Sequence, residues 1–239
     1  MVLQCVDCGS KFPLTSGLKS KCEKCGGILE YKIALPKHGK IKLSGQISFW
    51  RYKPLLPPVK NRVSLGEGGT PLHKAERLAK DLELQRLFLK DETRNPTNSF
   101  RDRAAALMTS QALDLKYATL ICATNGNLGA SLAAYCAKAG LNCHIIVPKL
   151  VDVGKLAQML VYDAVIEEYG DIVDDSILRA EALAKEMGWY QATAELNPII
   201  IEAQKTISYE VFEQCGVPDW FIVSMGSGGT IYSIWKGFK

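Results

Sequence analysis

The sequence predicts a three-layer α/β fold with mostly parallel sheets, preceded by a small metal-binding ribbon at the N-terminus. From residue 117 to about 190, short apolar runs alternate with longer helical patterns. This alternation is typical of a parallel sheet with helices on both faces. Glycine-rich turns follow two apolar runs and precede helices, and two Cys-x-x-Cys pairs lie within the first 25 residues.

The composition is that of a folded globular protein. The chain has 239 residues, of which 47% are hydrophobic and 23% charged, with a net charge of +4. These values argue against disorder. No polybasic run suggests nucleic acid or a membrane surface as a partner, and the sequence shows neither a signal peptide nor an apolar run long enough to span a membrane. The expected location is the cytoplasm.

Residues 1–32 are predicted to form a zinc ribbon. The ligands would be Cys5, Cys8, Cys22 and Cys25, and a glycine follows the second cysteine of each pair. Four thiolates at this spacing suit one tetrahedral ion and leave no open coordination position, which indicates structural zinc. Iron and an empty site remain alternatives, whereas a redox role lacks the thioredoxin-like strand–helix context.

The other cysteines are interpreted as buried free thiols, which suit a reducing compartment. They are Cys122, Cys136, Cys143 and Cys215.

Residues 33–64 are predicted to be a linker and residues 65–239 the α/β domain. The segment Phe49–Pro58 is aromatic and then proline-rich. Proline fixes φ and interrupts a helix, so an extended linker anchored by its aromatic side chains is expected.

The α/β domain is predicted to begin with a strand at Arg86–Lys90. Asn95 precedes a proline and is kept out of helical geometry, and Asn98 or Ser99 can cap a helix that runs towards Ala112. Residue 101 then lies in the first turn, where the helix dipole favours an anion. The following strands are expected at Ala118–Ala123, Cys143–Val147, Ala164–Glu168 and Trp220–Met225. The helices are expected at Gly126–Ala139, Val153–Tyr162 and Ile172–Met187, after Lys205, and from near Ile231.

Two strand–glycine–helix turns are candidate anion sites. The first is Thr124-Asn125-Gly126-Asn127-Leu128-Gly129, and the second is Gly226-Ser227-Gly228-Gly229-Thr230. Backbone N–H groups at a helix start bind anions. The second turn is neither a Walker nor a Rossmann motif, because its spacing matches neither pattern.

Several segments together resemble threonine synthase and the wider family of fold-type II pyridoxal-phosphate (PLP) enzymes. The segment Asn95-Pro96-Thr97-Asn98-Ser99-Phe100-Arg101-Asp102-Arg103 is similar to the family's Asn-Pro-Thr-Gly-Ser-Phe-Lys-Asp-Arg. The stretch at 66–72 and the run Lys205-Thr206-Ile207-Ser208-Tyr209-Glu210 also match, in the family order. The resemblance implies the fold-type II, tryptophan synthase β-like class.

The resemblance also implies site residues. The family reaction converts O-phosphohomoserine and water to threonine and phosphate. Asn127 would bond the 3′-oxygen of the PLP ring, and the backbone of Thr124, Asn125, Gly126, Asn127 and Leu128 would hold the substrate carboxylate. Gly226, Ser227, Gly228, Gly229 and Thr230 would cradle the cofactor phosphate.

Arg101 stands at the position of the family's Schiff-base lysine. A guanidinium stays protonated and is no amine nucleophile. The chain also ends before the family's later strands, so it is expected to be inactive, with PLP bound non-covalently if at all. Lys90 is interpreted as structural, and no geometric reason brings Lys155 or Lys205 to the ring.

Two other functions remain open. One is a non-catalytic homologue that binds PLP or a phosphorylated amino acid, or that serves a partner chain. The other is a related enzyme such as cysteate synthase, which acts on O-phosphoserine. A homodimer or a complementing chain is a possible assembly.

Overall fold

The computed structural model describes residues 2–14, 19–33 and 42–239, and its largest sheet is parallel throughout. The strand order is β8-β7-β6-β9. The strands are β6 (Thr119–Ala123), β7 (Asn142–Val147), β8 (Val165–Glu168) and β9 (Tyr190–Gln191). The predicted parallel sheet is therefore confirmed, and the short β9 is an addition that the sequence pattern did not indicate.

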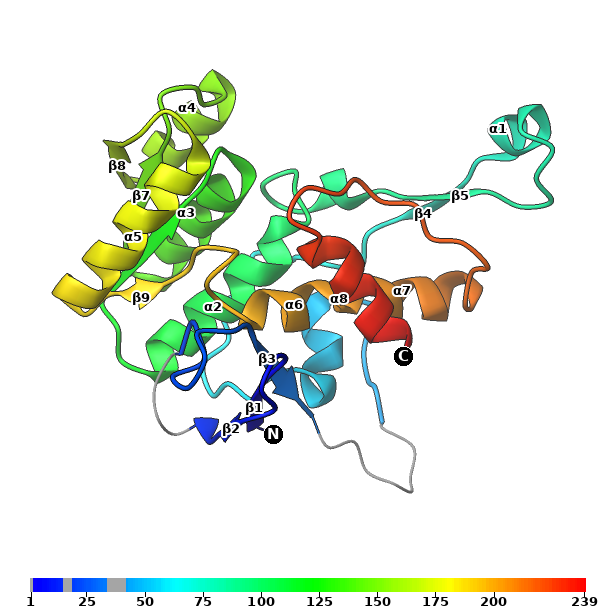
Figure 1. Cartoon of the computed structure of the whole chain (residues 1–239). Helices are drawn as coiled ribbons and strands as arrows, with labels where there is room; N and C mark the ends of the chain where they lie inside the picture. Colours follow the sequence, from blue (N-terminus) through cyan, green and yellow to red (C-terminus); the bar gives the residue numbers. More distant parts are fainter. Residues whose placement is uncertain (1, 15–18, 34–41) are drawn as a thin grey trace.

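Helices cover both faces of this sheet (Figure 1). On one face, α5 (Val173–Met187) buries Ala180 against Ile121, Ala123 and Ile146. On the other face, α3 (Asn127–Ala139) contacts β6 and β7, α4 (Val153–Val161) contacts β8, and α2 (Arg101–Asp114) packs behind α3. The central strands are buried on both faces, which explains their continuous apolar runs.

The helix ends follow local signals. α3 ends at Gly140 with φ +68° and α5 at Gly188 with φ +65°. Glycine adopts this left-handed conformation without a steric penalty. α4 begins after Asp152, whose carboxylate accepts a hydrogen bond from the backbone N–H of Lys155 at 2.9 Å.

The C-terminal part of the chain contains α6 (Ile199–Gln204), α7 (Thr206–Cys215) and α8 (Gly229–Phe238). α8 packs against both preceding helices. Ser208 donates a hydrogen bond to the carbonyl oxygen of Ile234 at 2.7 Å. A Cβ at Gly237 would lie 2.6 Å from the carbonyl oxygen of Lys205, so this close approach requires glycine.

The predicted strand Trp220–Met225 is wrong. These residues have no regular structure, and the Trp220 and Ile222 side chains are 86% and 91% exposed. A strand needs a hydrogen-bonded neighbour, and no strand in the described part of the chain pairs with this segment. α8 also begins at Gly229 instead of near Ile231, so the last two residues of the predicted phosphate loop lie in its first turn.

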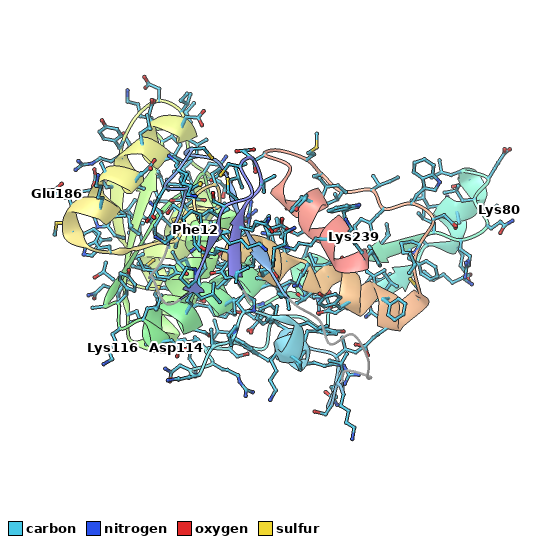
Figure 2. All side chains as sticks on the ribbon, turned by 60° about the horizontal axis from the view of Figure 1, so that its bottom comes forward. Phe12, Lys80, Asp114, Lys116, Glu186 and Lys239 are labelled. Carbon is cyan, nitrogen blue, oxygen red and sulfur yellow. The ribbon has the colours of Figure 1, made fainter. Side chains whose placement is uncertain are left out.

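An antiparallel hairpin extends away from the parallel sheet (Figure 1). It consists of β4 (Leu72–Lys74), α1 (Glu76–Asp81) and β5 (Phe88–Lys90). Lys80, at the end of α1, marks its outer tip in Figure 2. The predicted strand at 86–90 is therefore shorter and is not part of the parallel sheet.

The N-terminal ribbon is a sheet of three antiparallel strands in the order β2-β1-β3. The strands are β1 (Val2–Cys5), β2 (Lys11–Phe12) and β3 (Leu29–Lys32). Its buried residues Leu3 and Tyr31 belong to the same apolar cluster as α2. The hydroxyl of Tyr31 accepts a hydrogen bond from Gln111 at 3.2 Å, so the ribbon is attached to the main body.

Residues 34–41 of the predicted linker lie outside the described residues. Within the rest, Phe49–Leu55 forms a 3-10 helix (η2), so the expectation of an extended segment is wrong there. The aromatic anchors are present, because Phe49 and Tyr52 are fully buried. Among the helices that the structure describes, none is long and apolar enough to cross a membrane.

Candidate functional site

The residues singled out from the sequence lie at the starts of three helices. Arg101 is the first residue of α2, Asn127 is the first residue of α3, and Gly229 is the first residue of α8. A helix start presents unpaired N–H groups and the positive end of the dipole. All three positions therefore favour an anionic ligand group.

Arg101 is half-buried, and its guanidinium lies 4.9 Å from the centre of the Phe100 ring. Burial lowers the pKa of Arg101, and the negative charge of Glu195 partly offsets this effect. No hydrogen bond from its guanidinium to another described residue is present. Glu195, between β9 and α6, is the acidic residue that acts on this guanidinium, and the two form no ion pair in the described part of the chain.

Arg103, two residues later, has a different environment. It is fully buried and donates to both carboxylate oxygens of Glu210, to Oε1 of Glu92 at 2.7 Å and to Oε2 of Glu92 at 2.8 Å. Lys90 donates to Glu210 at 2.7 Å. This buried ion cluster (Arg103, Glu210, Glu92 and Lys90) joins the start of α2 to α7 and explains why Lys90 and Glu210 have structural roles.

Asp102 anchors the segment from the other side. It is fully buried, and its carboxylate accepts hydrogen bonds from the N–H of Thr97 at 2.7 Å and from its hydroxyl at 2.5 Å. The Thr97 hydroxyl lies 2.9 Å from that of Ser131 on α3. Burial raises the pKa of Asp102, and the hydrogen bonds from Thr97 counteract this rise. Segment 95–103 is thereby held against α3.

The loop Thr124–Leu128 connects β6 to α3. Gly126 has φ +154° and ψ −91°, a conformation that side-chain-bearing residues rarely adopt, and its N–H donates to the Thr124 hydroxyl at 3.1 Å. The N–H groups of Asn127, Leu128 and Gly129 have no hydrogen-bond acceptor among the described groups. The side chains of Asn125 and Asn127 are exposed, whereas Leu128 and Gly129 are buried.

The loop Gly226–Thr230 is open. A Cβ at Gly226 or Gly228 would meet nothing within 4 Å, and Gly228 has φ +83°. The N–H groups of Gly229, Thr230 and Ile231 also have no acceptor among the described groups. No hydrogen bond between described residues joins this loop to Arg101 or to loop 124–128. The contacts described above hold segment 95–103 against α3, which follows loop 124–128, but none of them includes Gly226–Thr230.

The four ribbon cysteines converge. Their Sγ atoms all lie within 4.8 Å of one another, with Cys5 and Cys25 at 3.5 Å and Cys8 and Cys22 at 3.6 Å. Ligands about 2.3 Å from a tetrahedral zinc ion are about 3.8 Å apart. The arrangement is therefore consistent with the zinc ribbon that the spacing predicts.

Sequence reasoning missed two features of the site. One is the pairing of Glu210 with Arg103. Thr206 and Glu210 both contact Arg103 and are spaced i, i+4, which places them on one face of a helix, but this spacing alone does not identify Arg103 as their partner. The other is the position of Lys155, whose Cγ lies 3.4 Å from where a Cβ of Gly126 would be. Neither contact is local in the sequence.

Glu210 makes folding stability depend on acid pH. Burial alone would raise its pKa, but Arg103 and Lys90 lower it to about 2 from an ordinary value of 4.5. A lowered carboxyl pKa stabilises the folded state above the unfolded value, and this contribution disappears as pH falls through the folded value. We expect urea unfolding to show a loss of about 3 kcal/mol between pH 4.5 and 2 from this group.

A matched pair of variants tests this pH dependence. Glu210→Gln is expected to be less stable at pH 7 and to have a flatter stability profile between pH 4.5 and 2. Glu168→Gln, at an exposed glutamate, is the control and should keep the profile. An unchanged slope in Glu210→Gln would contradict the assignment.

A protein-family comparison places most of the chain in one group. Residues 63–239 match the family described as pyridoxal-phosphate dependent enzyme. The chain is 40% identical over 250 residues to the threonine synthase of Methanocaldococcus jannaschii and 36% identical over 243 residues to that of Methanosarcina acetivorans. These matches cover 100% and 99% of this chain but 61% and 60% of the relatives, so the chain spans about three fifths of their length.

Solved structures show the same fold. The processed form of threonine deaminase isoform 2 from Solanum lycopersicum aligns with a TM-score of 0.65 at 21% identity, covering 85% of this chain and 58% of that chain. A pyridoxal 5′-phosphate-dependent aspartate racemase aligns with a TM-score of 0.63 at 25% identity, covering 69% and 52%. The fold-type II α/β architecture expected from the sequence is confirmed.

Proposed function

Because the chain belongs to the family of pyridoxal-phosphate-dependent enzymes and is a homologue of threonine synthases, we propose that it has a threonine-synthase-type cofactor and substrate site without the covalent anchor. The observation that carries this proposal is the set of helix starts: unpaired N–H groups at α3 and α8, and Arg101 at the first turn of α2. The substrate class is a phosphorylated amino acid such as O-phosphohomoserine.

The residues present fit non-covalent PLP. The open loop Gly226–Thr230, with unpaired N–H groups at Gly229, Thr230 and Ile231, suits a phosphate because glycine lets the group approach the backbone. The exposed Asn127 amide has no hydrogen-bond partner among the described residues and can donate to a ring oxygen. When bound, PLP supplies the electron sink that stabilises negative charge on a substrate carbon.

The covalent part of the family chemistry does not fit Arg101. Bond formation with the cofactor's aldehyde needs a neutral amine, and burial does not lower the pKa of an arginine far enough to supply one. Arg101 instead keeps a fixed positive charge at the start of α2. Loss of a general base alone typically costs ~10²–10⁴-fold in rate. We therefore propose that the chain binds the cofactor but does not turn over substrate.

We also propose that Cys5, Cys8, Cys22 and Cys25 hold one structural zinc ion. Four thiolates complete a tetrahedral coordination sphere and leave no position for a substrate. Cys5 and Cys22 are buried in the cluster that contains α2, so the metal stabilises the ribbon on the main body.

Borohydride trapping tests the proposed site. We expect the chain mixed with PLP to give no borohydride-stable adduct by peptide mass spectrometry, while equilibrium dialysis detects non-covalent cofactor. Arg101→Lys is expected to give an adduct at residue 101, because it restores the amine at the start of α2. An adduct on any lysine of the unmodified chain would refute the role given to Arg101, and no cofactor binding by either protein would refute the site.

A further inference from the structure

The ribbon strand β3 contacts two helices whose starts belong to the proposed site. Tyr31 makes both contacts. Its hydroxyl accepts a hydrogen bond from Gln111 on α2 at 3.2 Å, and its backbone carbonyl oxygen accepts one from Nζ of Lys236 on α8 at 2.8 Å. α2 begins at Arg101, and α8 begins within the loop Gly226–Thr230. One strand of the ribbon is therefore bonded to both helices.

Lys236 also lies between two buried carboxylates. Its Nζ is 2.6 Å from Oε1 of Glu30 on β3 and 2.6 Å from Oε1 of Glu202 on α6. Glu202 is fully buried and pairs with Lys205 at 2.5 Å. Moving Lys236 away would leave buried charges without compensation, which is strongly unfavourable. Lys236 therefore fixes α8 against both β3 and α6.

The contact between the ribbon and α8 is ionic at neutral pH. Burial alone would raise the pKa of Glu30, but Lys236 and Lys32 hold it below its ordinary value of 4.5. Lys32, which pairs with the second oxygen of Glu30 at 2.7 Å, lies on β3 and is exposed. The two lysines share one carboxylate, but only Lys236 belongs to α8.

The position of β3 depends on the four ribbon thiols. Cys5 pairs with Leu29, the first residue of β3, in the antiparallel sheet. The backbone N–H of Cys22 donates to the carbonyl oxygen of Gly27, just before β3, at 2.9 Å. The ribbon strands have only two to four residues, and a sheet of this size buries too little apolar surface to be stable without help. Metal binding is thus expected to order β3.

α8 carries the effect of this contact to the loop Gly226–Thr230. Lys236 and Gly229 lie about two turns apart on one continuous helix. Between them, the Ser233 hydroxyl donates a hydrogen bond to the carbonyl oxygen of Gly229 at 2.7 Å. A displacement of Lys236 therefore also displaces the unpaired N–H groups of the first turn of α8.

We propose that Lys236 is a positioning residue that couples metal binding in the ribbon to the anion affinity of the loop Gly226–Thr230. With metal bound, Glu30 and the Tyr31 carbonyl hold α8, and the N–H groups of its first turn stay in place. Without metal, β3 loses its order and Glu202 alone anchors Lys236. That the anion is the phosphate of PLP rests on the proposed function, whereas the anchoring of α8 does not.

Equilibrium dialysis with PLP measures the coupling in the metal-loaded and the chelator-treated chain, at a temperature where circular dichroism shows both to be folded. We expect metal removal to weaken PLP binding at least about 5-fold, the lower end of typical couplings between two sites. Lys236→Met is expected to weaken binding as much with metal bound and to show little further loss without it. Lys236→Arg keeps the charge and is expected to recover most of the affinity.

Variants studied with metal bound keep the test independent of the folding of the metal-free chain. Glu30→Gln is expected to weaken PLP binding as Lys236→Met does. The double variant is expected to lose little more than either single variant, because both break the same ion pair. Lys32→Gln removes the other partner of Glu30 without touching α8, so it should bind PLP like the unmodified chain and keep the metal dependence.

Amide hydrogen exchange monitors α8 without any cofactor. We expect the amides of α8 to exchange faster after metal removal and in Lys236→Met, because the helix has lost an anchor. The amides of α4, which contacts α3 and β8, are the internal control and should keep their rates.

The outcomes separate this proposal from the proposed function. If PLP binds with an affinity that neither metal removal nor Lys236→Met changes, the coupling is refuted and the proposed function stands, even if α8 exchanges faster. If PLP binds to no form, the proposed function falls, and faster exchange of α8 in both conditions still supports the anchoring by Lys236. Absence of PLP binding together with unchanged exchange of α8 overturns both.

Discussion

Replacement of Arg103 by methionine is expected to lower the free energy of unfolding by about 3–5 kcal/mol. Arg103 is fully buried and supplies the charge that balances Glu92 and Glu210. Removal of one partner leaves a buried carboxylate without compensation, which costs more than the pair contributes when intact. The positive charge of Lys90 does not replace that of Arg103, because burial lowers the pKa of Lys90.

Urea unfolding at pH 7 measures this change, with two comparisons. Arg103→Lys keeps the charge but loses the planar fork that serves both carboxylates, so an intermediate loss is expected. Arg77→Ala, on the exposed face of α1, is the surface control and is expected to change stability by less than about 0.5 kcal/mol. A loss below about 1 kcal/mol for Arg103→Met would show that the cluster does not hold α2 to α7.

Removal of metal from the ribbon is expected to have the other large effect. A ligand that binds only the folded state stabilises it by about 4 kcal/mol when present at 1,000 times its dissociation constant. Structural zinc in thiolate sites commonly exceeds this ratio. We therefore expect a chelator to reduce stability by at least this amount and to break the contact between the ribbon and α2, where Tyr31 accepts a hydrogen bond from Gln111.

Metal analysis and thermal unfolding check this expectation. The isolated chain should contain one zinc per chain, and Cys22→Ser should contain far less and unfold at a lower temperature. Cys215→Ser is the matched control, because Cys215 is half-buried and lies outside the four-thiol cluster. A metal content near zero in the unmodified chain, or equal unfolding temperatures with and without chelator, would contradict the zinc proposal.

Much of the fold could be predicted because its signals are local. The apolar runs at β6 and β7 and the helical periods of α3 and α5 predicted those elements to within a few residues. The strand predicted at 220–225 failed for a non-local reason. Its apolar residues have strand character, but a strand exists only with a bonded neighbour.

In the candidate site, too, local features could be predicted from the sequence and non-local contacts could not. The spacing of the four cysteines predicted their convergence, which the structure shows. The glycine turn before α3 likewise predicted a loop with free N–H groups. The sequence indicated no geometric reason for Lys155 to reach the site, yet α4 places its side chain against Gly126.

The sequence by itself determined the order of the elements from β6 to α5, the four ribbon thiols, the anion-favouring helix starts and the arginine at position 101. These depend on residue type and on spacing within a few positions, which secondary structure translates directly into geometry. Only the tertiary structure decided that Glu210 pairs with Arg103, 107 residues away, and that Lys155 covers Gly126. Such contacts depend on how helices pack, so no local pattern specifies them.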